Sequence, residues 1–264
     1  TIGICVYDDY DGAFFTLQSL RMYHSEVMDR VEFVVINNNP ASDHGKALKN
    51  IVDTITEPKT YLEYTKYSSP FIKGKIFDIA ETEYVLVMDS HVLLEPGSLK
   101  KLLDYYDKGL DNGNLLNVST HFDFSSKEWS GYMWGAWATD KRGTKFNGKP
   151  FTIPGNGMGL FSCRKDAWLG FNKSMRGFGG EEGYIHEKYK LNGKETICLP
   201  FLRWNHRFAK PSGTPYKLDI KQRFRNYMIA FQEVEKDTQE VVDNFKQVVS
   251  EDFIKEVKKE LNIT

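Results

Sequence analysis

Short apolar runs alternate with stretches of helical periodicity along the first 111 residues. Strands are predicted where apolar and β-branched residues run together and polar turn residues follow, over residues 2–7, 31–36 and 84–88. Helices are predicted between and after these strands, over residues 13–22, 46–55, 71–80 and 99–106. This alternation is typical of βαβ units and predicts an α/β fold with a mostly parallel sheet.

The rest of the chain has a different pattern. Residues 112–215 are rich in glycine and aromatic side chains, with short strand candidates over 115–120, 159–163 and 196–199. After Pro215 no glycine or proline follows, and Phe224, Met228, Phe231 and Val234 recur at helical spacing. We therefore predict one domain over 1–215, with halves 1–111 and 112–215, and a helical extension over 216–264 whose last helix is capped by Ser250.

Composition narrows the class of protein. The 264 residues include 35 basic and 36 acidic ones, so the net charge of −1 argues against an indiscriminate nucleic-acid binder. No apolar run approaches the roughly 18 residues of a membrane span. Three cysteines far apart in the sequence (Cys5, Cys163 and Cys198) favour reduced core thiols over a disulfide framework. With no basic segment before the first apolar run, we expect no signal peptide and a cytoplasmic or intracellular protein.

The sharpest chemical signal is the end of the strand over 84–88. Asp89 and His91 follow it at a spacing of two, which puts both side chains on one side of the chain at the edge where open α/β sheets bind ligands. A carboxylate with an imidazole suits Mn²⁺ or Mg²⁺ holding a diphosphate. The alternative is that Asp89 caps a turn and His91 is a structural histidine.

Four motifs then carry a family resemblance. Residues 33–39 (FVVINNN), 72–80 (IKGKIFDIA), 83–91 (EYVLVMDSH) and 96–99 (PGSL) match in order and spacing the nucleotide-sugar domain of GT-A glycosyltransferases of the family-2-like branch. The D-S-H sequence stands where most members carry D-x-D, and it is similar to that of polypeptide N-acetylgalactosaminyltransferases. The resemblance implies a GT-A, Rossmann-like fold with a mostly parallel central sheet.

The narrower resemblance continues downstream. Residues 157–161 (GMGLF), 177–182 (GFGGEE) and 203–206 (RWNH) occur in the order of that family's corresponding motifs. Phe178 replaces the usual tryptophan, and only Arg203 and His206 remain of the Cys-Ser-Arg-x-Gly-His pattern. Residues 155–183 also hold eight of the 21 glycines, as expected where backbone approaches a ligand or turns repeatedly.

The resemblance, with the chemistry of the side chains, implies a site. Asp89, His91 and His206 would hold Mn²⁺ or Mg²⁺, Glu181 would bind acceptor or sugar, and Glu182 stands where inverting relatives carry a catalytic base. Donor contacts are expected from Tyr7, Asp9, Asn37, Lys75, Asp89, Ser90, Gly157, Gly159, Arg203 and Arg207. The acceptor is expected at Glu181 and at Trp134 and Trp137, whose rings either stack on a sugar or belong to the core.

A local concentration of positive charge bears on the partners. Residues 203–225 contain seven basic side chains and one acidic one, a net charge of +6. Part of this charge would serve the diphosphate. The remainder either lies on a solvated helix face or holds an anionic acceptor such as nucleic acid or an acidic glycan.

The sequence thus predicts a metal-dependent glycosyltransferase that moves a sugar from a nucleotide sugar, UDP-linked by resemblance, to a hydroxyl of a protein, glycan or modified nucleic acid. Two alternatives stay open. A sugar-phosphate nucleotidyltransferase shares the α/β architecture, but residues 7–12 (YDDYDG) lack the basic first loop of that class. A catalytically silent nucleotide-sugar-binding module would keep the fold without turnover.

Overall fold

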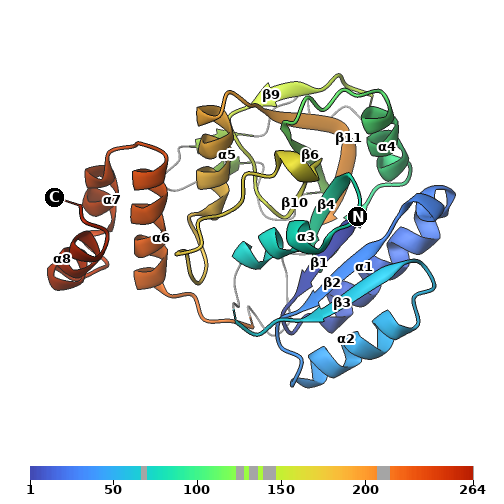
Figure 1. The fold of residues 1–264 in the computed structure, drawn as a ribbon, viewed down its shortest axis with the longest axis horizontal. Helices are drawn as coiled ribbons and strands as arrows, with labels where there is room; N and C mark the ends of the chain where they lie inside the picture. The colour runs from blue at the N-terminus through green and yellow to red at the C-terminus, as the bar shows by residue number, and fades with distance from the viewer. Residues whose placement is uncertain (67–69, 123–127, 131–135, 139–146, 207–214, 264) are drawn as a thin grey trace.

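The computed structural model describes residues 1–66, 70–122, 128–130, 136–138, 147–206 and 215–263. Helices cover both faces of a central sheet (Figure 1). The strands are β1 Ile2–Val6, β2 Phe33–Asn37, β3 Lys59–Glu63, β4 Tyr84–Asp89, β5 Val92–Leu94, β6 Leu115–Phe122, β7 Glu128–Ser130, β8 Ala136–Ala138, β9 Phe151–Ile153, β10 Leu160–Arg164 and β11 Thr196–His206. The helices are α1 Tyr10–Tyr23, α2 Asp43–Asp53, α3 Lys73–Ile79, α4 Ser98–Asp107, α5 Glu181–Leu191, α6 Ile220–Glu233, α7 Thr238–Phe245 and α8 Glu251–Glu260.

The sheet is parallel in its first half, as the alternation predicts. Its strand order is β3-β2-β1-β4-β10-β6-β11-β5, and β9 also pairs with β11. Strands β3, β2, β1 and β4 are parallel, β10 runs antiparallel between β4 and β6, and β11 is parallel to β6. Because Cys5 of β1 pairs with Asp89 of β4, the segment that follows β1 lies beside the end of β4.

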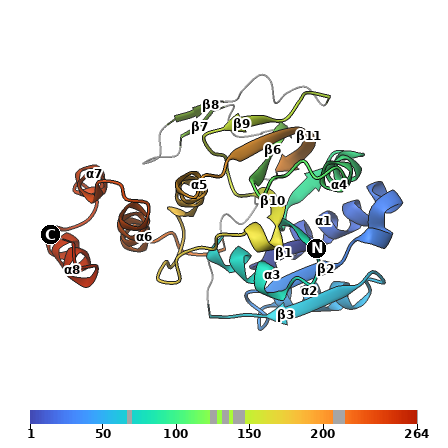
Figure 2. The ribbon, with the colours of Figure 1, turned by 45° about the horizontal axis from the view of Figure 1, so that its top comes forward.

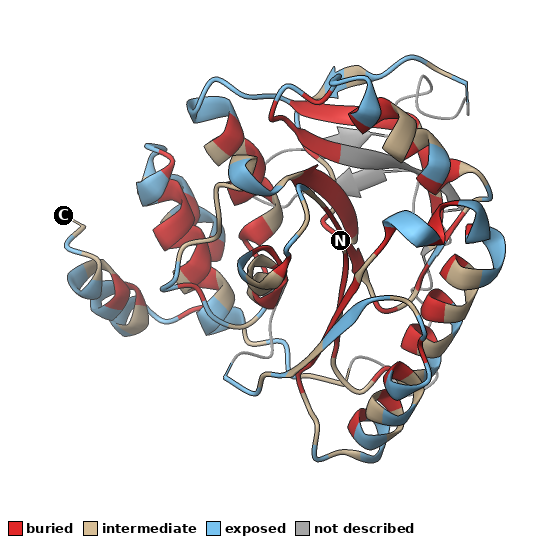
Figure 3. Ribbon diagram, turned by 45° about the vertical axis from the view of Figure 1, so that its right-hand side comes forward, coloured by how far each residue is buried: buried red, intermediate tan, exposed pale blue. Residues whose placement is uncertain are grey.

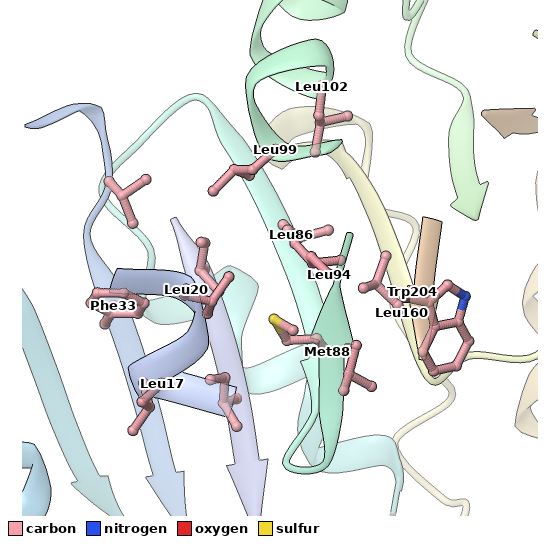
Figure 4. Close-up of a cluster of buried hydrophobic side chains, with 14 of the residues drawn as sticks. Leu17, Leu20, Phe33, Leu86, Met88, Leu94, Leu99, Leu102, Leu160 and Trp204 are labelled. Carbon is pink, nitrogen blue, oxygen red and sulfur yellow. The ribbon is translucent and has the colours of Figure 1, made fainter. Parts of the chain in front are cut away.

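Two apolar layers hold the helices to the sheet. On one face, α1, α2 and α4 cover the sheet. Leu17 of α1 and Leu99 of α4 belong there to the same apolar cluster as Met88 of β4 (Figure 4). On the other face, α3 and α5 bury Ile76 and Tyr184 against the sheet. Figure 3 shows the resulting pattern, with the strands largely buried and the outer helix faces exposed. A strand buried on both faces reads as a continuous apolar run, which is why β1, β2 and β4 are recognisable in the sequence.

Helix α6 connects the sheet domain to the last helices. Ile229 and Ala230 belong to the same apolar cluster as α3 and α5, whereas Phe224 and Met228 pack with α7 and α8. Both views place α6 beside α5, with α7 and α8 beyond it (Figures 1 and 2). Ser250 caps α8 by accepting a hydrogen bond from the Phe253 N–H, as predicted. The division at residue 215 stays a prediction, although α6 is part of both clusters.

Some elements differ from the sequence predictions. Strands β3, β5 and β9 and helix α7 were not predicted, and α1 begins at Tyr10 rather than residue 13. β3 is an edge strand with three exposed residues, and β5 and β9 have three residues each, so none carries a strong apolar pattern. β11 continues past Pro200 to His206 because its register against β6 shifts between Leu199 and Arg203, which accommodates the missing amide hydrogen. Across the described ranges, no helix has both the length and the apolar character needed to cross a membrane.

Candidate active site

The loop after β1 meets the loop after β4 at a buried carboxylate. Asp9 Oδ2 accepts hydrogen bonds from Ser90 Oγ and from His91 Nδ1, each at 2.6 Å. Gly12 makes this approach possible, because a Cβ there would lie 2.8 Å from the Ser90 carbonyl oxygen and 2.5 Å from Asp9 Oδ2. The predicted donor residues Asp9 and Ser90 are therefore assembled around His91.

Asp9 fixes the orientation of the His91 ring. An ionised carboxylate only accepts hydrogen bonds, so His91 donates from Nδ1 and presents the acceptor nitrogen Nε2. Nε2 lies 4.0 Å from Asp89 Oδ2. A carboxylate oxygen and an imidazole nitrogen are ligand types that such ions accept, so Asp89 and His91 would together hold a divalent ion. A carboxylate behind a ligating histidine is also the usual outer-shell arrangement of metal sites. These residues therefore fit Mn²⁺ or Mg²⁺.

The backbone of His206, the third predicted ligand, lies next to the segment that follows His91. β11 pairs with β5 so that His206 lies opposite Val92, the residue after His91. The His206 side chain, Trp134 and Arg207 lie outside the described residues, and Trp137 is described only as a backbone partner of Trp129 in β7–β8. Within the described part of the chain, no three His, Cys, Asp or Glu side chains are grouped as metal ligands.

A buried lysine also meets Asp89. Lys73 is the first residue of α3; its Nζ lies 2.6 Å from Asp89 Oδ1 and donates to the Met158 carbonyl at 2.6 Å. Burial opposes its charge, but the attraction of Asp89 outweighs that cost and raises the pKa of Lys73. The predicted donor residue Lys75 instead pairs with Asp78 on the partly exposed face of α3, at 3.0 Å. Two positions along a helix point in nearly opposite directions, so only Lys73 reaches Asp89.

The predicted donor glycines form the wall beside Asp89. The Asp89 N–H donates to the Gly159 carbonyl at 2.8 Å. A Cβ on Gly159 would lie 2.8 Å from the Trp204 ring and 3.3 Å from Asp89 Oδ2. Gly157 has more room, since its Cβ would lie 3.6 Å from Glu182 Oε1. Gly159 is thus required for β10 to pass between the indole and the carboxylate.

Glu181 and Glu182 open α5 after a glycine loop, residues 177–180. Gly177, Gly179 and Gly180 have φ of +66°, +103° and +96°, a region that favours glycine. The side chain of Glu181 is buried, with 3% of the residue exposed, and its Oε2 accepts no hydrogen bond from any described residue. Helix α5 therefore begins at the predicted pair itself.

The two carboxyl groups are shifted toward their protonated forms. Burial raises the pKa of Glu181. Burial and then the neighbouring Glu181 carboxylate raise the pKa of Glu182 to about 8, although Glu182 Oε1 accepts the Met158 N–H at 3.1 Å. A carboxyl group whose pKa is raised toward neutral pH suits a general base.

His186, one turn after Glu182 on α5, connects the start of this helix to the loop before β10. It is 3% exposed; Nδ1 lies 2.6 Å from the Glu182 carbonyl oxygen, and Nε2 accepts the Asn156 N–H at 3.4 Å. Burial lowers the pKa of His186 to about 4, so the ring is neutral. It joins α5 to the loop that contains Gly157, which is a structural role.

Two further predicted donor residues are engaged within the protein. Asn37 is buried and donates from Nδ2 to the Gly45 carbonyl and the Tyr61 hydroxyl, at 2.9 and 2.7 Å. Arg203 Nε lies 3.2 Å from Glu95 Oε2, in a mostly buried ion pair. These contacts hold β2 to α2 and β11 to β5, so both side chains have structural roles in this state.

A row of three aromatic rings connects the end of β1 to the glycine loop. Tyr7 meets Tyr216 edge to face with centroids 6.1 Å apart, and Tyr216 stacks on Phe178 at 5.9 Å. Burial raises the pKa of Tyr216, and Asp89 adds to the shift, so Tyr216 belongs to the site. Sequence reasoning missed Tyr216 because it follows a Gly- and Pro-containing segment with no periodic pattern.

Two basic side chains of the predicted basic segment are neutralised locally. Besides the Arg203 pair, Arg225 forms an ion pair with Glu260. Lys221 Nζ lies 5.1 Å from the centre of the Phe253 ring. Arg207 and Lys210 lie outside the described residues. The described part of this segment is therefore no uniform basic surface.

An open α/β sheet with Asp89 and His91 at the end of a parallel strand, and with Glu181 and Glu182 nearby at the start of α5, is the arrangement of a GT-A glycosyltransferase. Residues 1–168, well over half of the chain, match the model of "Glycosyl transferase family 2". The chain belongs to this family, which confirms the predicted resemblance, fold and enzyme class. The nucleotidyltransferase alternative is thereby wrong. No curated protein sequence matches the chain.

Solved structures share the fold at low sequence identity. GalNAc-T7 with UDP, GalNAc and Mn²⁺ matches with a TM-score of 0.72 and 12% identity over 100% of this chain and 55% of that one. The mannosyltransferase PcManGT from Pyrobaculum calidifontis, with GDP-Man and Mn²⁺, matches with a TM-score of 0.61 and 12% identity. The match covers 99% of this chain and 79% of that one. TarS 1-349 of S. aureus with UDP-GlcNAc matches with a TM-score of 0.58 and 13% identity. The match covers 93% of this chain and 70% of that one. This chain thus spans little more than half of the GalNAc-T7 chain.

Proposed function

We propose that this chain is a divalent-metal-dependent glycosyltransferase that transfers a sugar from a UDP-linked donor to an acceptor hydroxyl. The observation that carries the proposal is that Asp89, beside His91 at the end of β4, lies close enough to the glutamates that open α5 for its charge to act on Glu182. Solved structures with a similar fold contain UDP with GalNAc, GDP-Man or UDP-GlcNAc, and two of the three contain Mn²⁺, which supports a nucleotide-sugar donor and a divalent ion.

The donor would lie on the Asp89 side. Asp89, His91 and His206 would hold Mn²⁺ or Mg²⁺, which when bound neutralises charge on the leaving diphosphate. Lys73 adds a buried positive charge beside Asp89. Tyr7 and Asp9 would border the nucleoside. Further donor-side contacts are assigned to Ser90, Gly157, Gly159 and Arg207.

The acceptor would lie on the α5 side. Glu182 has a pKa raised toward the working pH, so it takes up the proton of the attacking hydroxyl and then releases it. Glu181 binds the acceptor through a carboxylate oxygen that no described residue satisfies. Phe178, 36% exposed next to this pair, offers a ring face to a sugar. Trp134 and Trp137 stay proposed acceptor residues.

The test is metal-stimulated turnover. With Mn²⁺ and a panel of UDP sugars, we expect donor hydrolysis in the absence of acceptor and transfer in its presence, and Asp89→Ala should abolish both. Asp78→Ala is the matched control, because this aspartate lies on the surface of α3 and pairs with Lys75. Metal-stimulated turnover that survives Asp89→Ala would sink the assignment. Absence of turnover with every nucleotide sugar, alongside donor binding, would favour the silent binding module.

A further inference from the structure

Asn226 of α6 contacts the loop that leads into the catalytic pair. Asn226 is fully buried, with 0% of its surface exposed. Nδ2 donates to the carbonyl oxygens of Arg176 and Gly179, at 2.5 and 3.0 Å, and Oδ1 accepts the Arg176 N–H at 2.9 Å. One buried amide therefore binds both ends of the turn that precedes Gly180 and Glu181. Asn226 lies beyond the residues that match the family model.

The glycine loop is shaped to receive α6. A Cβ on Gly177 would lie 2.1 Å from Gln222 Oε1, and one on Gly179 would lie 2.9 Å from Arg223 Cγ. A Cβ on Gly180 would lie 3.3 Å from the Cβ of Asn226. The three glycines therefore serve both the positive φ angles and the close packing of α6.

A glycine-rich loop needs external contacts to hold one conformation, because glycine loses more backbone freedom on folding than any other residue. Glu181 depends on such contacts, since no described residue donates a hydrogen bond to its Oε2. Hydrogen bonds from the backbone of Gly179 and of Glu181 itself do reach its carboxyl group, so its direction depends on the backbone of the glycine loop. Of the side chains packed on that backbone, Asn226 donates directly to the Gly179 carbonyl.

We propose that Asn226 is a positioning residue for the Glu181–Glu182 pair, acting through the backbone of the glycine loop. This proposal rests on the proposed function. A displacement of about 1 Å at a reacting group can cost about a hundredfold in rate. α6 is then a part of the active-site structure.

Asn226→Ala tests the proposal against a matched control. We expect kcat for transfer to fall at least tenfold, with the donor KM within twofold of the wild type, because the Asp89 side is untouched. Met228→Ala is the control: Met228 is on the same helix, is 0% exposed and packs toward α7 and α8. It should lower the melting temperature without this split between kcat and KM. Asn226→Asp keeps the shape of the side chain but places an acceptor against two carbonyl oxygens, so it should lower kcat equally. It serves as the test variant if the alanine variant does not fold.

Hydrogen exchange supplies a readout that needs no turnover. Amides of residues 177–183 should exchange at least tenfold faster in Asn226→Ala or Asn226→Asp than in the wild type, and should be unchanged in Met228→Ala. Unchanged exchange in this segment, or a loss of kcat that only matches Met228→Ala, overturns the proposal. If the wild type transfers no sugar, the proposed function fails, and exchange alone decides whether Asn226 holds the loop.

Discussion

Glu182→Gln should stabilise the folded protein while it removes the proposed base. The pKa of Glu182 rises from an ordinary value of 4.5 to about 8, because burial and then Glu181 disfavour its ionised form. Between these two pH values the folded state binds more protons than the unfolded state. Stability is therefore lost as pH rises from about 4.5 to about 8. A neutral glutamine of the same shape avoids this loss.

The magnitude follows from the size of the shift. A difference of 3.5 between the two pKa values, at about 1.4 kcal/mol per unit, sets an upper limit of about 5 kcal/mol above pH 8. The local structure relaxes around a charge, and Glu181 shares the proton, so we expect about 1–3 kcal/mol. For a chain of this size that corresponds to a rise in melting temperature of roughly 3–10 °C.

Thermal unfolding of the metal-free protein between pH 5 and pH 9 measures this effect. The difference between Glu182→Gln and wild type should be small at pH 5 and grow up to about pH 8. Glu187→Gln is the control, because it makes the same change on the same helix at a carboxylate that lies 3.6 Å from Lys236. A difference that does not depend on pH, or a glutamine variant that is less stable at pH 8, would refute the reasoning.

Three further predictions concern the surroundings of the pair. Lys73→Met should raise the Kd of UDP with Mn²⁺ at least tenfold, because a buried positive charge beside Asp89 is lost, and Lys75→Met should leave it unchanged in calorimetry. Gly159→Ala should lower stability by about 1–3 kcal/mol in urea unfolding, since its Cβ would lie 2.8 Å from a ring atom, whereas Gly157→Ala should cost less. The neutral ring of His186 should cost up to about 3 kcal/mol of stability as pH falls from about 6.5 to about 4, and His186→Gln should flatten that part of the urea-derived stability profile.

The strand that leads to the donor side of the site could be predicted from the sequence. The strand that ends at Asp89 is a continuous apolar run with polar residues after it. Such a run can be recognised in the sequence without knowing what packs against the strand. The choice between Lys73 and Lys75 could not be predicted in the same way. α3 has only seven residues and begins at Lys73, so its helical phase depends on where the preceding turn ends. Two lysines around one glycine give no signal that separates them.

The role of α6 was beyond the sequence for a different physical reason. Periodicity identified Phe224, Met228, Phe231 and Val234 as one apolar face, which predicts a helix but not the surface it covers. In the structure α6 is buried on two sides, and its polar Asn226 binds the loop before Glu181. A buried asparagine costs free energy unless its hydrogen bonds are made. Asn226 directly follows Arg225 in the sequence and resembles one more residue of the polar helix face, so only the packing of the glycine loop on α6 shows which backbone groups satisfy it.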